Sequence, residues 1–422
     1  MAAFCSGAAH RYVFRFAMAA LAFGAIVPLV QLSRNFPQNK SLGTVDAITK
    51  NESNMTIERN RTEAKCCQGI RCNSNKEVQS GRVGLYHIFV ILVARGDFET
   101  RIFEPMWDTV LRGLQGRENE CGYRVLPMSA QHPDHNFMFP VGPQSGDVLI
   151  LVGFADMFTF FKKCKHVYLP GGVSCIYYNS EPGREKGAMN IRYDSVCEVW
   201  DYTRANEPIA PVVRHVPAGF LPQEATLEEM DRMVFEKVKN LDMKELKLIF
   251  IGTMTPQRKT CWEHMKVVGV KYFSGFEDVH FFGTLGLVQL GRLRNRVFLN
   301  IHNLCNLSSG PDALETVRLS QLLSAGSVVL SENANPRDVK LYDGIVFFEP
   351  NLFSDTSHWS PELRNILTNG TALAEWQLNS YRIFKKKFDP MQLMQDAGIW
   401  NSSSASSALA PPALANCSLQ GR

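Results

Sequence analysis

Short apolar runs recur along the chain from about residue 85 and are separated by polar stretches. Runs of this length, with many β-branched and aromatic residues, predict buried strands rather than helices. Stretches near 98–116, 154–163 and 184–190 have the pattern of helices between some of them. Strands that alternate with helices are typical of a parallel sheet covered on both faces. The first half is therefore expected to be an α/β domain with strands at Leu85–Val93, Asp147–Gly153, Val173–Asn179 and Cys197–Tyr202.

The same pattern restarts after an acidic helix that we expect at Thr226–Asn240. Thr226 suits the N-cap of this helix, and Glu229 three residues later completes a capping box. Short apolar runs with turn residues beside them follow, and a closing helix is expected at Leu373–Phe388. The second half is therefore expected to be another α/β domain, with strands at Leu246–Gly252, Val270–Gly275, Val297–His302, Ser327–Glu332 and Gly344–Pro350.

The N-terminal segment has the pattern of a membrane anchor. The first 45 residues hold no Asp or Glu, and Phe16–Ser33 is uncharged and mostly apolar. As a helix it would span about 27 Å, near the thickness of the endoplasmic reticulum bilayer. Arg11 and Arg15 precede it, which favours a cytosolic N-terminus and a lumenal body. A signal peptide cleaved near Ala22–Gly24 and an organelle transit peptide are the alternatives.

Asn-X-Ser/Thr sequons recur far more often than the about two expected by chance, which favours passage through the secretory pathway. The chain also holds 11 cysteines, which could form several disulfides in an oxidising compartment. Their connectivity cannot be read from the spacing. We therefore expect a glycosylated single-pass type II protein of the Golgi or endoplasmic reticulum membrane, with glycans at Asn51, Asn54, Asn60, Asn306, Asn369, Asn401 and Asn416.

Charge and motif content argue against several classes of function. The net charge is only +4, and no run of Lys and Arg exceeds three residues, so no nucleic-acid partner is expected. The chain has no Walker A, GxGxxG or GxSxG motif, which removes support for P-loop, dehydrogenase and α/β-hydrolase interpretations. It also has no Asp-X-Asp and no CxxC pair, so no metal site is expected.

In a parallel α/β sheet, ligands bind beyond the carboxyl ends of the strands. The first such loop in the second half contains Gly252, which permits a close backbone approach, and then Arg258 and Lys259 beside a helix that Pro256 is expected to open. Helix N-terminal amides and two cations would suit a diphosphate. The alternative is a surface loop with two solvated cations.

Two later strands end in polar side chains. Asn300 and His302 lie on one side of a strand end, where His302 could donate to a phosphate or a sugar hydroxyl or be a buried core histidine. Glu315 lies near the start of a helix and could bind vicinal hydroxyls or merely complement the helix dipole. Ser331 and Glu332 end the next strand, so the polar groups at both ends of this unit are expected to face one cleft.

Four stretches look like the serial motifs of GT-B glycosyltransferases, and the nearest group is the spore-maturation glycosyltransferase-like proteins. They occur in the family's order over about Val148–Phe348 and read VWDYTRANEPIAPVVRHVPAGF, FIGTMTPQRK, VFLNIHN and ETVRLSQLLSAGSVVLSEN. The resemblance implies two Rossmann-like domains that face each other across a cleft. It places the donor nucleotide on the C-terminal domain and the acceptor mainly on the N-terminal domain.

Carried over to this chain, the family pattern puts Gly252 and Arg258 at the donor diphosphate. It puts Glu315 and Arg318 at the sugar or ribose of the donor. One position departs from the pattern: many relatives have Glu five residues before the Gly of the SAG turn, and this chain has Gln321. Gln can still form a hydrogen bond with a ribose, but it carries no charge.

The expected reaction moves a sugar from a nucleotide-sugar donor, a co-substrate rather than a cofactor, to a hydroxyl of a glycan, glycoprotein or glycolipid. Arg258, Lys259 and helix N-termini would stabilise the leaving diphosphate without a metal. An inverting enzyme also needs a base, for which Glu181 and Asp201 are candidates. The alternative is a non-catalytic lumenal protein of the same fold that binds a sugar or nucleotide, which the departure at Gln321 favours.

The expected organisation combines these patterns. Polar, sequon-rich sequence is typical of a stalk, and the low-complexity C-terminal tail is expected to be disordered. The expected segments are a cytosolic tip and transmembrane anchor at 1–33, a stalk at 34–80, an acceptor-side Rossmann-like domain at 81–220, a linker helix at 221–245, a donor-binding Rossmann-like domain at 246–372, a closing helix at 373–400 and the tail at 401–422.

Overall fold

The computed structural model describes most of the body of the chain. The segments expected to form the anchor, the stalk and the tail lie outside the described residues. Within the described part of the chain, no helix has both the length and the apolar character that crossing a membrane requires. The described residues are 86–94, 97–118, 123–131, 139–153, 164–168, 170–180, 198–206, 213–221, 226–279, 286–302, 305 and 313–397.

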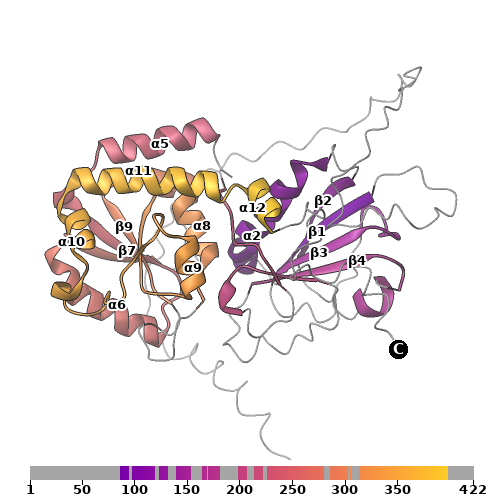
Figure 1. The fold of residues 1–422 in the computed structure, drawn as a ribbon, viewed down its shortest axis with the longest axis horizontal. Helices are drawn as coiled ribbons and strands as arrows, with labels where there is room; N and C mark the ends of the chain where they lie inside the picture. Colours follow the sequence, from indigo (N-terminus) through magenta and orange to yellow (C-terminus); the bar gives the residue numbers. More distant parts are fainter. Residues whose placement is uncertain are drawn as a thin grey trace, which may run out of the picture. The chain divides into compact units, whose positions relative to one another are not determined.

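The first half contains a six-stranded parallel sheet in the order β2-β1-β3-β4-β5-β6 (Figure 1). Four of its strands were predicted, and β2 and β6 were not. Strand β2 includes Pro127 and pairs only with β1, and an edge strand tolerates a proline that a central strand would not. The strands are β1 (Tyr86–Ala94), β2 (Tyr123–Gln131), β3 (Val148–Gly153), β4 (Ser174–Asn179), β5 (Glu198–Asp201) and β6 (Val213–His215).

The second half contains a five-stranded parallel sheet in the order β11-β10-β9-β7-β8. The strand expected at Val270–Gly275 is wrong. Gly269–Lys271 forms a 3₁₀ turn that leaves Val270 69% exposed, and β8 begins only at Gly275. The strands are β7 (Lys247–Ile251), β8 (Gly275–Val279), β9 (Arg296–Asn300), β10 (Val328–Ser331) and β11 (Phe347–Phe348).

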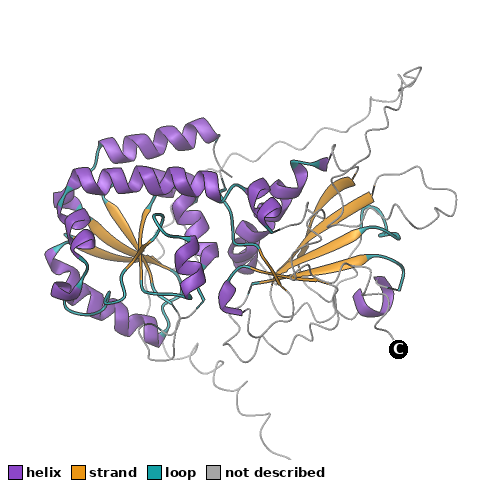
Figure 2. Ribbon diagram, in the orientation of Figure 1, coloured by secondary structure: helices purple, strands orange, loops and turns teal. Residues whose placement is uncertain are grey.

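Helices cover both sheets (Figure 2). Their ends follow the capping rules: Thr226 and Glu229 form the expected capping box of α5, and Pro256 is the first residue of α6. The described helices are α2 (Asp97–Gln115), α5 (Leu227–Lys239), α6 (Pro256–Val268), α7 (Leu287–Arg292), α8 (Thr316–Ser324), α9 (Pro336–Leu341), α10 (Pro361–Thr368), α11 (Gly370–Lys387) and α12 (Pro390–Asp396). Short turns of π or 3₁₀ type lie at Cys164–Tyr168, Arg204–Asn206, Met243–Glu245, Gly269–Lys271 and Thr356–His358.

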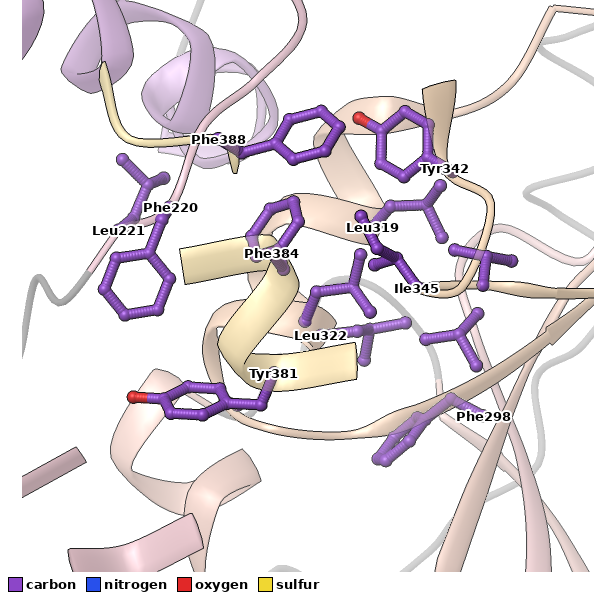
Figure 3. Packing of buried hydrophobic residues seen from close by; sticks show 14 of the residues in the cluster. Phe220, Leu221, Phe298, Leu319, Leu322, Tyr342, Ile345, Tyr381, Phe384 and Phe388 are labelled. Carbon is purple, nitrogen blue, oxygen red and sulfur yellow. The ribbon is translucent and has the colours of Figure 1, made fainter. Parts of the chain in front are cut away.

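The expected linker helix is an integral part of the second half. Met230 and Val234 of α5 are buried in the same apolar cluster as α8 and α11, and α5 lies beside α11 (Figure 1). Figure 3 shows this cluster, in which Phe384 and Phe388 stack at 4.8 Å and Tyr381 lies near Leu322. Residues 226–245 therefore belong to the second domain rather than to a connection between domains.

The closing segment at 373–400 contains two helices instead of one. Asp389 caps α12, and Pro390 is its first residue and cannot continue α11 because it has no backbone N–H to donate. Helix α12 packs on α2, and Met394 is buried in the core cluster of the first sheet. The chain thus crosses back to the first half before it leaves the described residues.

Helix α8 contacts the cores of both halves. Leu322 is buried in the second cluster, whereas Val317 packs against the first. A buried hydrogen bond of 2.6 Å from Thr203 Oγ1 to Asp338 Oδ2 also joins the halves. The helix begins at Thr316 with Glu315 at the N-cap position.

Candidate functional site

Three neighbouring strands of the second sheet end at the edge where the sequence predicts a ligand. Because β10, β9 and β7 are adjacent and parallel, the residues after their last positions meet there. Gly252 follows β7 with a φ of +149°, a conformation that L-residues rarely adopt. A Cβ at this position would lie 3.0 Å from Nη2 of Arg318. The glycine therefore leaves room for an arginine from another element.

Arg258 points from the first turn of α6 back to the end of β9. Its Nε donates to the carbonyl of Ile301 and its Nη1 to the carbonyl of Thr253, each at 3.1 Å, and its Nη2 forms an ion pair with Glu315. The side chain is 8% exposed. The alternative of a solvated surface cation is therefore wrong for Arg258.

Arg318 approaches the same carboxylate from α8. Its Nη2 binds Glu315, and its Nη1 donates to Oδ1 of Asn300 at 3.1 Å. Asn300 in turn donates to Oγ of Ser331 on the neighbouring strand at 3.0 Å. The fold therefore brings together four polar residues that the sequence placed at separate strand and helix ends.

Both guanidinium groups lie over one aromatic ring. The Cζ atoms of Arg258 and Arg318 are 6.0 and 5.5 Å from the ring centroid of Phe250. Phe250 is fully buried in β7, so its ring face holds the two cations without competing for their N–H donors. Sequence reasoning missed Phe250, because a buried aromatic in a strand has no distinguishing pattern.

The charges in this cluster reinforce one another. Burial raises the pKa of Glu315, but the nearby charges of Arg318 and Arg258 outweigh it, so its pKa lies below the ordinary value. Burial lowers the pKa of Arg318 to about 10, and the Glu315 carboxylate acts against that change. All three groups are therefore ionised at neutral pH, and the arginine–glutamate triad (Arg258, Glu315 and Arg318) carries one net positive charge.

His302 stands beside the triad. Its backbone N–H donates to Oε1 of Glu332 at 2.5 Å, and its Nδ1 lies 3.9 Å from the same oxygen. Within the described chain, Nε2 of His302 and Nε of Arg318 have no hydrogen-bond partner, although the residues are only 3% and 7% exposed. Buried polar atoms without partners are rare in native proteins, and Nε of Arg318, together with Nε2 of His302 when it is protonated, could donate to a bound anion.

Two other predicted donor-site residues form no hydrogen bond or ion pair with the triad within the described chain. Lys259 follows Arg258 on α6 and is exposed, which fits the alternative of a solvated cation. Gln321 is half-buried on α8. Their roles in donor binding stay predictions.

The structure describes one of the two residues predicted as a general base. Glu181 lies outside the described residues. Asp201 ends β5 and is fully buried, with one carboxylate oxygen bound by Nδ2 of Asn179 at 2.8 Å and the other by the backbone N–H of Thr203 at 3.0 Å. These contacts suit a structural role, and a role as general base stays a prediction.

A disulfide joins Cys261 of α6 to Cys305, three residues after His302. It links the helix that carries Arg258 to the segment that follows β9. The cysteine spacing did not reveal this pair, because the two residues are 44 positions apart and meet only through the fold. Within the described residues, no group of three or more His, Cys, Asp or Glu side chains is arranged to hold a metal ion. Metal independence stays a prediction.

Of the seven asparagines expected to carry glycans, only Asn369 is described; the others lie outside the described residues. Asn369 is exposed at the N-cap of α11, where its Oδ1 accepts hydrogen bonds from the N–H groups of Thr371 and Ala372 at 3.0 and 3.3 Å. These bonds leave the amide nitrogen, the atom that would carry a glycan, unused.

No protein-family model and no curated protein sequence matches the chain. Among solved structures, it is similar to Anabaena HepE in complex with UDP-glucose, with a TM-score of 0.41, 10% identity, and 74% of this chain and 98% of that chain covered. For an α1,3-fucosyltransferase the TM-score is 0.42 and the identity 8%, with 80% of this chain and 95% of that chain covered. For an α-glucosyltransferase in complex with UDP and DNA the TM-score is 0.42 and the identity 11%, with 72% of this chain and 95% of that chain covered. Similarity at this level carries no argument about activity.

Proposed function

We propose that this chain is a GT-B glycosyltransferase that binds the diphosphate of a nucleotide sugar at the arginine–glutamate triad. The sugar would pass to an acceptor hydroxyl of a glycan, glycoprotein or glycolipid. The proposal is supported by the serial sequence motifs and by the way the second half assembles their residues. The membrane anchor, the lumenal location and metal independence are further parts of the proposal.

One observation carries the proposal: two buried arginines converge with His302 at the carboxyl edge of a parallel sheet, and two side-chain nitrogens of this group have no hydrogen-bond partner among the described residues. A planar guanidinium presents paired N–H groups that match the oxygens of a phosphate. The net positive charge of the triad favours an anionic ligand over a neutral sugar. A diphosphate is the part of a nucleotide sugar that offers both negative charge and several acceptor oxygens.

The same groups would contribute to the chemical step. As the glycosidic bond to the donor breaks, the leaving diphosphate gains negative charge. Arg258 and Arg318 are fixed in place over Phe250 before this charge develops, so little reorganisation is needed to stabilise it. This contribution needs no titratable group, because both arginines stay charged at neutral pH.

A non-catalytic binding protein is the second candidate. The observation that favours it is at Asp201, the described one of the two candidate bases, whose two carboxylate oxygens both accept hydrogen bonds in a buried setting. A retaining glycosyltransferase would not depend on this residue. Transfer of sugar to any acceptor, or hydrolysis of the donor, would exclude the binding-protein function.

The first experiment is a thermal-shift panel of UDP-, GDP- and other sugar donors with the purified full chain. One donor class should raise the melting temperature, and Arg318→Met should weaken its binding by about 30- to 150-fold, because a charge-assisted hydrogen bond contributes about 2–3 kcal/mol. Arg318 is a better choice than Arg258, which also binds two backbone carbonyls.

The matched control is Arg296→Met. Arg296 is an arginine at the opposite end of β9, where it lies 3.6 Å from Glu277. It should leave donor binding unchanged. If no donor raises the melting temperature, or if both variants weaken binding equally, the proposal is wrong.

The proposed lumenal location has its own support and test. The Cys261–Cys305 disulfide suits an oxidising compartment, and the exposed Asn369 presents an accessible sequon. Digestion of the expressed protein with an N-glycosidase should increase its gel mobility, and Asn369→Gln should remove one glycan from the undigested protein. A protein whose mobility is the same before and after digestion would contradict this location.

A further inference from the structure

The carboxylate of the triad occupies the position in which an incoming anion would meet the arginines. One oxygen of Glu315 binds Arg258 and the other binds Arg318. The side chain of Glu315 is 29% exposed, whereas each arginine is 8% exposed. The glutamate is therefore the outermost member of the triad, and a ligand that arrives from solvent reaches it first.

Glu315 is the N-cap residue of α8, a position from which a side chain often caps its helix. The side chain of Glu315 forms no capping hydrogen bond with that helix. If it left the arginines, it could accept from the N–H groups of the first turn of α8, where a negative charge is stabilised. The two buried arginines would keep an anionic partner, because a phosphate would replace the carboxylate as it leaves.

We propose that Glu315 is a built-in competitor for the donor diphosphate, holding both arginines in the empty site and yielding them when phosphate binds. Glu315 therefore lowers the affinity of the triad for diphosphates, which speeds the release of the nucleoside diphosphate product. It is a positioning residue for the empty site rather than a catalytic residue. This inference rests on the proposed function for its biological meaning, but its physical content concerns inorganic anions as well.

The test measures the binding of inorganic pyrophosphate to the full chain by titration calorimetry. Glu315→Gln keeps the length of the side chain but removes its charge, so Arg258 and Arg318 lose their charged partner and should bind pyrophosphate about ten-fold more tightly. If that variant does not fold, Glu315→Asp gives a second measure, because its shorter side chain cannot reach both arginines and should tighten binding to a smaller extent.

Glu277→Gln is the matched control. Glu277 also pairs with two cations, Lys247 at 2.7 Å and Arg296 at 3.6 Å, but on β8 and away from the triad. Removing its charge should leave the affinity for pyrophosphate unchanged. This control separates local competition for the arginines from a general loss of negative charge.

The outcomes distinguish this inference from the proposed function. Tighter pyrophosphate binding by Glu315→Gln alone supports the inference, even if the wild-type chain binds no nucleotide sugar and the proposed function fails. If the wild-type chain binds a nucleotide sugar and Glu315→Gln binds pyrophosphate equally or more weakly, the proposed function stands and the inference is overturned. Absence of pyrophosphate binding by all of these proteins, or equal tightening in Glu277→Gln, overturns it as well.

Turnover gives a readout that a purely structural role would not move. If a donor and acceptor are found, Glu315→Gln should lower both KM for the donor and kcat, because tighter diphosphate binding slows product release. A variant that raises KM and leaves kcat unchanged would contradict the competitor role.

Discussion

At the carboxyl edge of each sheet, an asparagine donates a hydrogen bond to the neighbouring strand, but the residues around the two asparagines differ. In the first half, Asn179 donates across to Asp201, its register partner on the neighbouring strand. In the second half, Asn300 donates across to its register partner Ser331. The difference lies in what binds the asparagine oxygen: Tyr177 donates to it in the first half and Arg318 in the second.

That difference separates a structural network from the proposed binding site. At the first edge, the two described hydrogen bonds to the carboxylate of Asp201 come from neutral donors, Asn179 and Thr203. The second edge carries two arginines and one carboxylate, so a positive charge remains, together with side-chain nitrogens that have no hydrogen-bond partner among the described residues. Similar backbone geometry therefore does not determine function, because the charge and the unfilled hydrogen-bonding capacity of a few side chains decide it.

The largest expected effect that separates the halves concerns the disulfide of the second half. Cys261→Ala combined with Cys305→Ala should lower the free energy of unfolding of that half by about 4 kcal/mol, because the bridge closes a loop of 44 residues in the unfolded chain. Denaturant unfolding followed by tryptophan fluorescence measures this change.

Cys175→Ala is the control for the loss of a cysteine side chain, because Cys175 is a buried cysteine of the first half that is not part of this disulfide. The double variant should shift mainly the transition of the second half. An equal shift with Cys175→Ala would show that the disulfide does not distinguish the two halves.

The second effect concerns stability at the edge of the first sheet. Asp201→Ala should lower the free energy of unfolding by about 3 kcal/mol, because it leaves the buried donors of Asn179 and Thr203 without their acceptor. Donor binding by the folded variant should be unchanged. Asp355→Ala, which removes an exposed capping carboxylate, should cost about 1 kcal/mol or less.

The opposite result for Asp201 would break the comparison. If Asp201→Ala and Asp201→Asn fold with wild-type stability but lose sugar transfer, the first edge is catalytic. Asp201 would then be the general base that the sequence suggested.

A third effect arises from a buried ammonium in the second half. Lys237 of α5 is 2% exposed, and burial lowers its pKa to about 7, although its Nζ donates to the carbonyls of Leu290 and Ala325 and to Ser327. Between this value and the ordinary lysine pKa, the unfolded state binds the additional proton, so stability rises with pH. The expected gain from pH 7.5 to 9 is about 2 kcal/mol.

Lys237→Met should remove this pH dependence, whereas Lys239→Met, at an exposed position on the same helix, should retain it. Denaturation midpoints at several pH values measure how the stability of each variant depends on pH. If the stability of wild type and of Lys237→Met changes equally with pH, Lys237 stays charged in the folded protein.

The smallest effect concerns the glycine beside the triad. Gly252→Ala should destabilise the protein by about 1 kcal/mol because of its positive φ, and should weaken pyrophosphate binding several-fold because the added Cβ displaces Arg318. Gly344→Ala has a similar backbone penalty at φ +72°, but among the described residues its Cβ would contact Ile383 alone, at an ordinary 3.7 Å. Gly344→Ala should lose about as much stability as Gly252→Ala but should still bind pyrophosphate as the wild type does.

The sequence by itself determined the alternation of strands and helices, because hydrophobic period and capping residues act over a few positions. Strands β7, β9 and β10 were all predicted, to within two residues at each end, as were the capping box of α5 and the proline at the start of α6. The pattern failed at Val270, which is exposed on a turn, and at β2, where a proline lies in an edge strand. Local composition cannot distinguish an edge from a core.

The tertiary structure alone decided which polar groups meet. The sequence placed Arg258, His302 and Glu315 near one edge, but it assigned Glu315 to a sugar hydroxyl, whereas the fold commits that carboxylate to two arginines over Phe250. The pairing of Cys261 with Cys305 and the contact of Thr203 with Asp338 were also beyond the sequence. The physical reason is that hydrophobic period fixes which face of an element is buried, while ion pairs depend on distances between elements far apart in the chain.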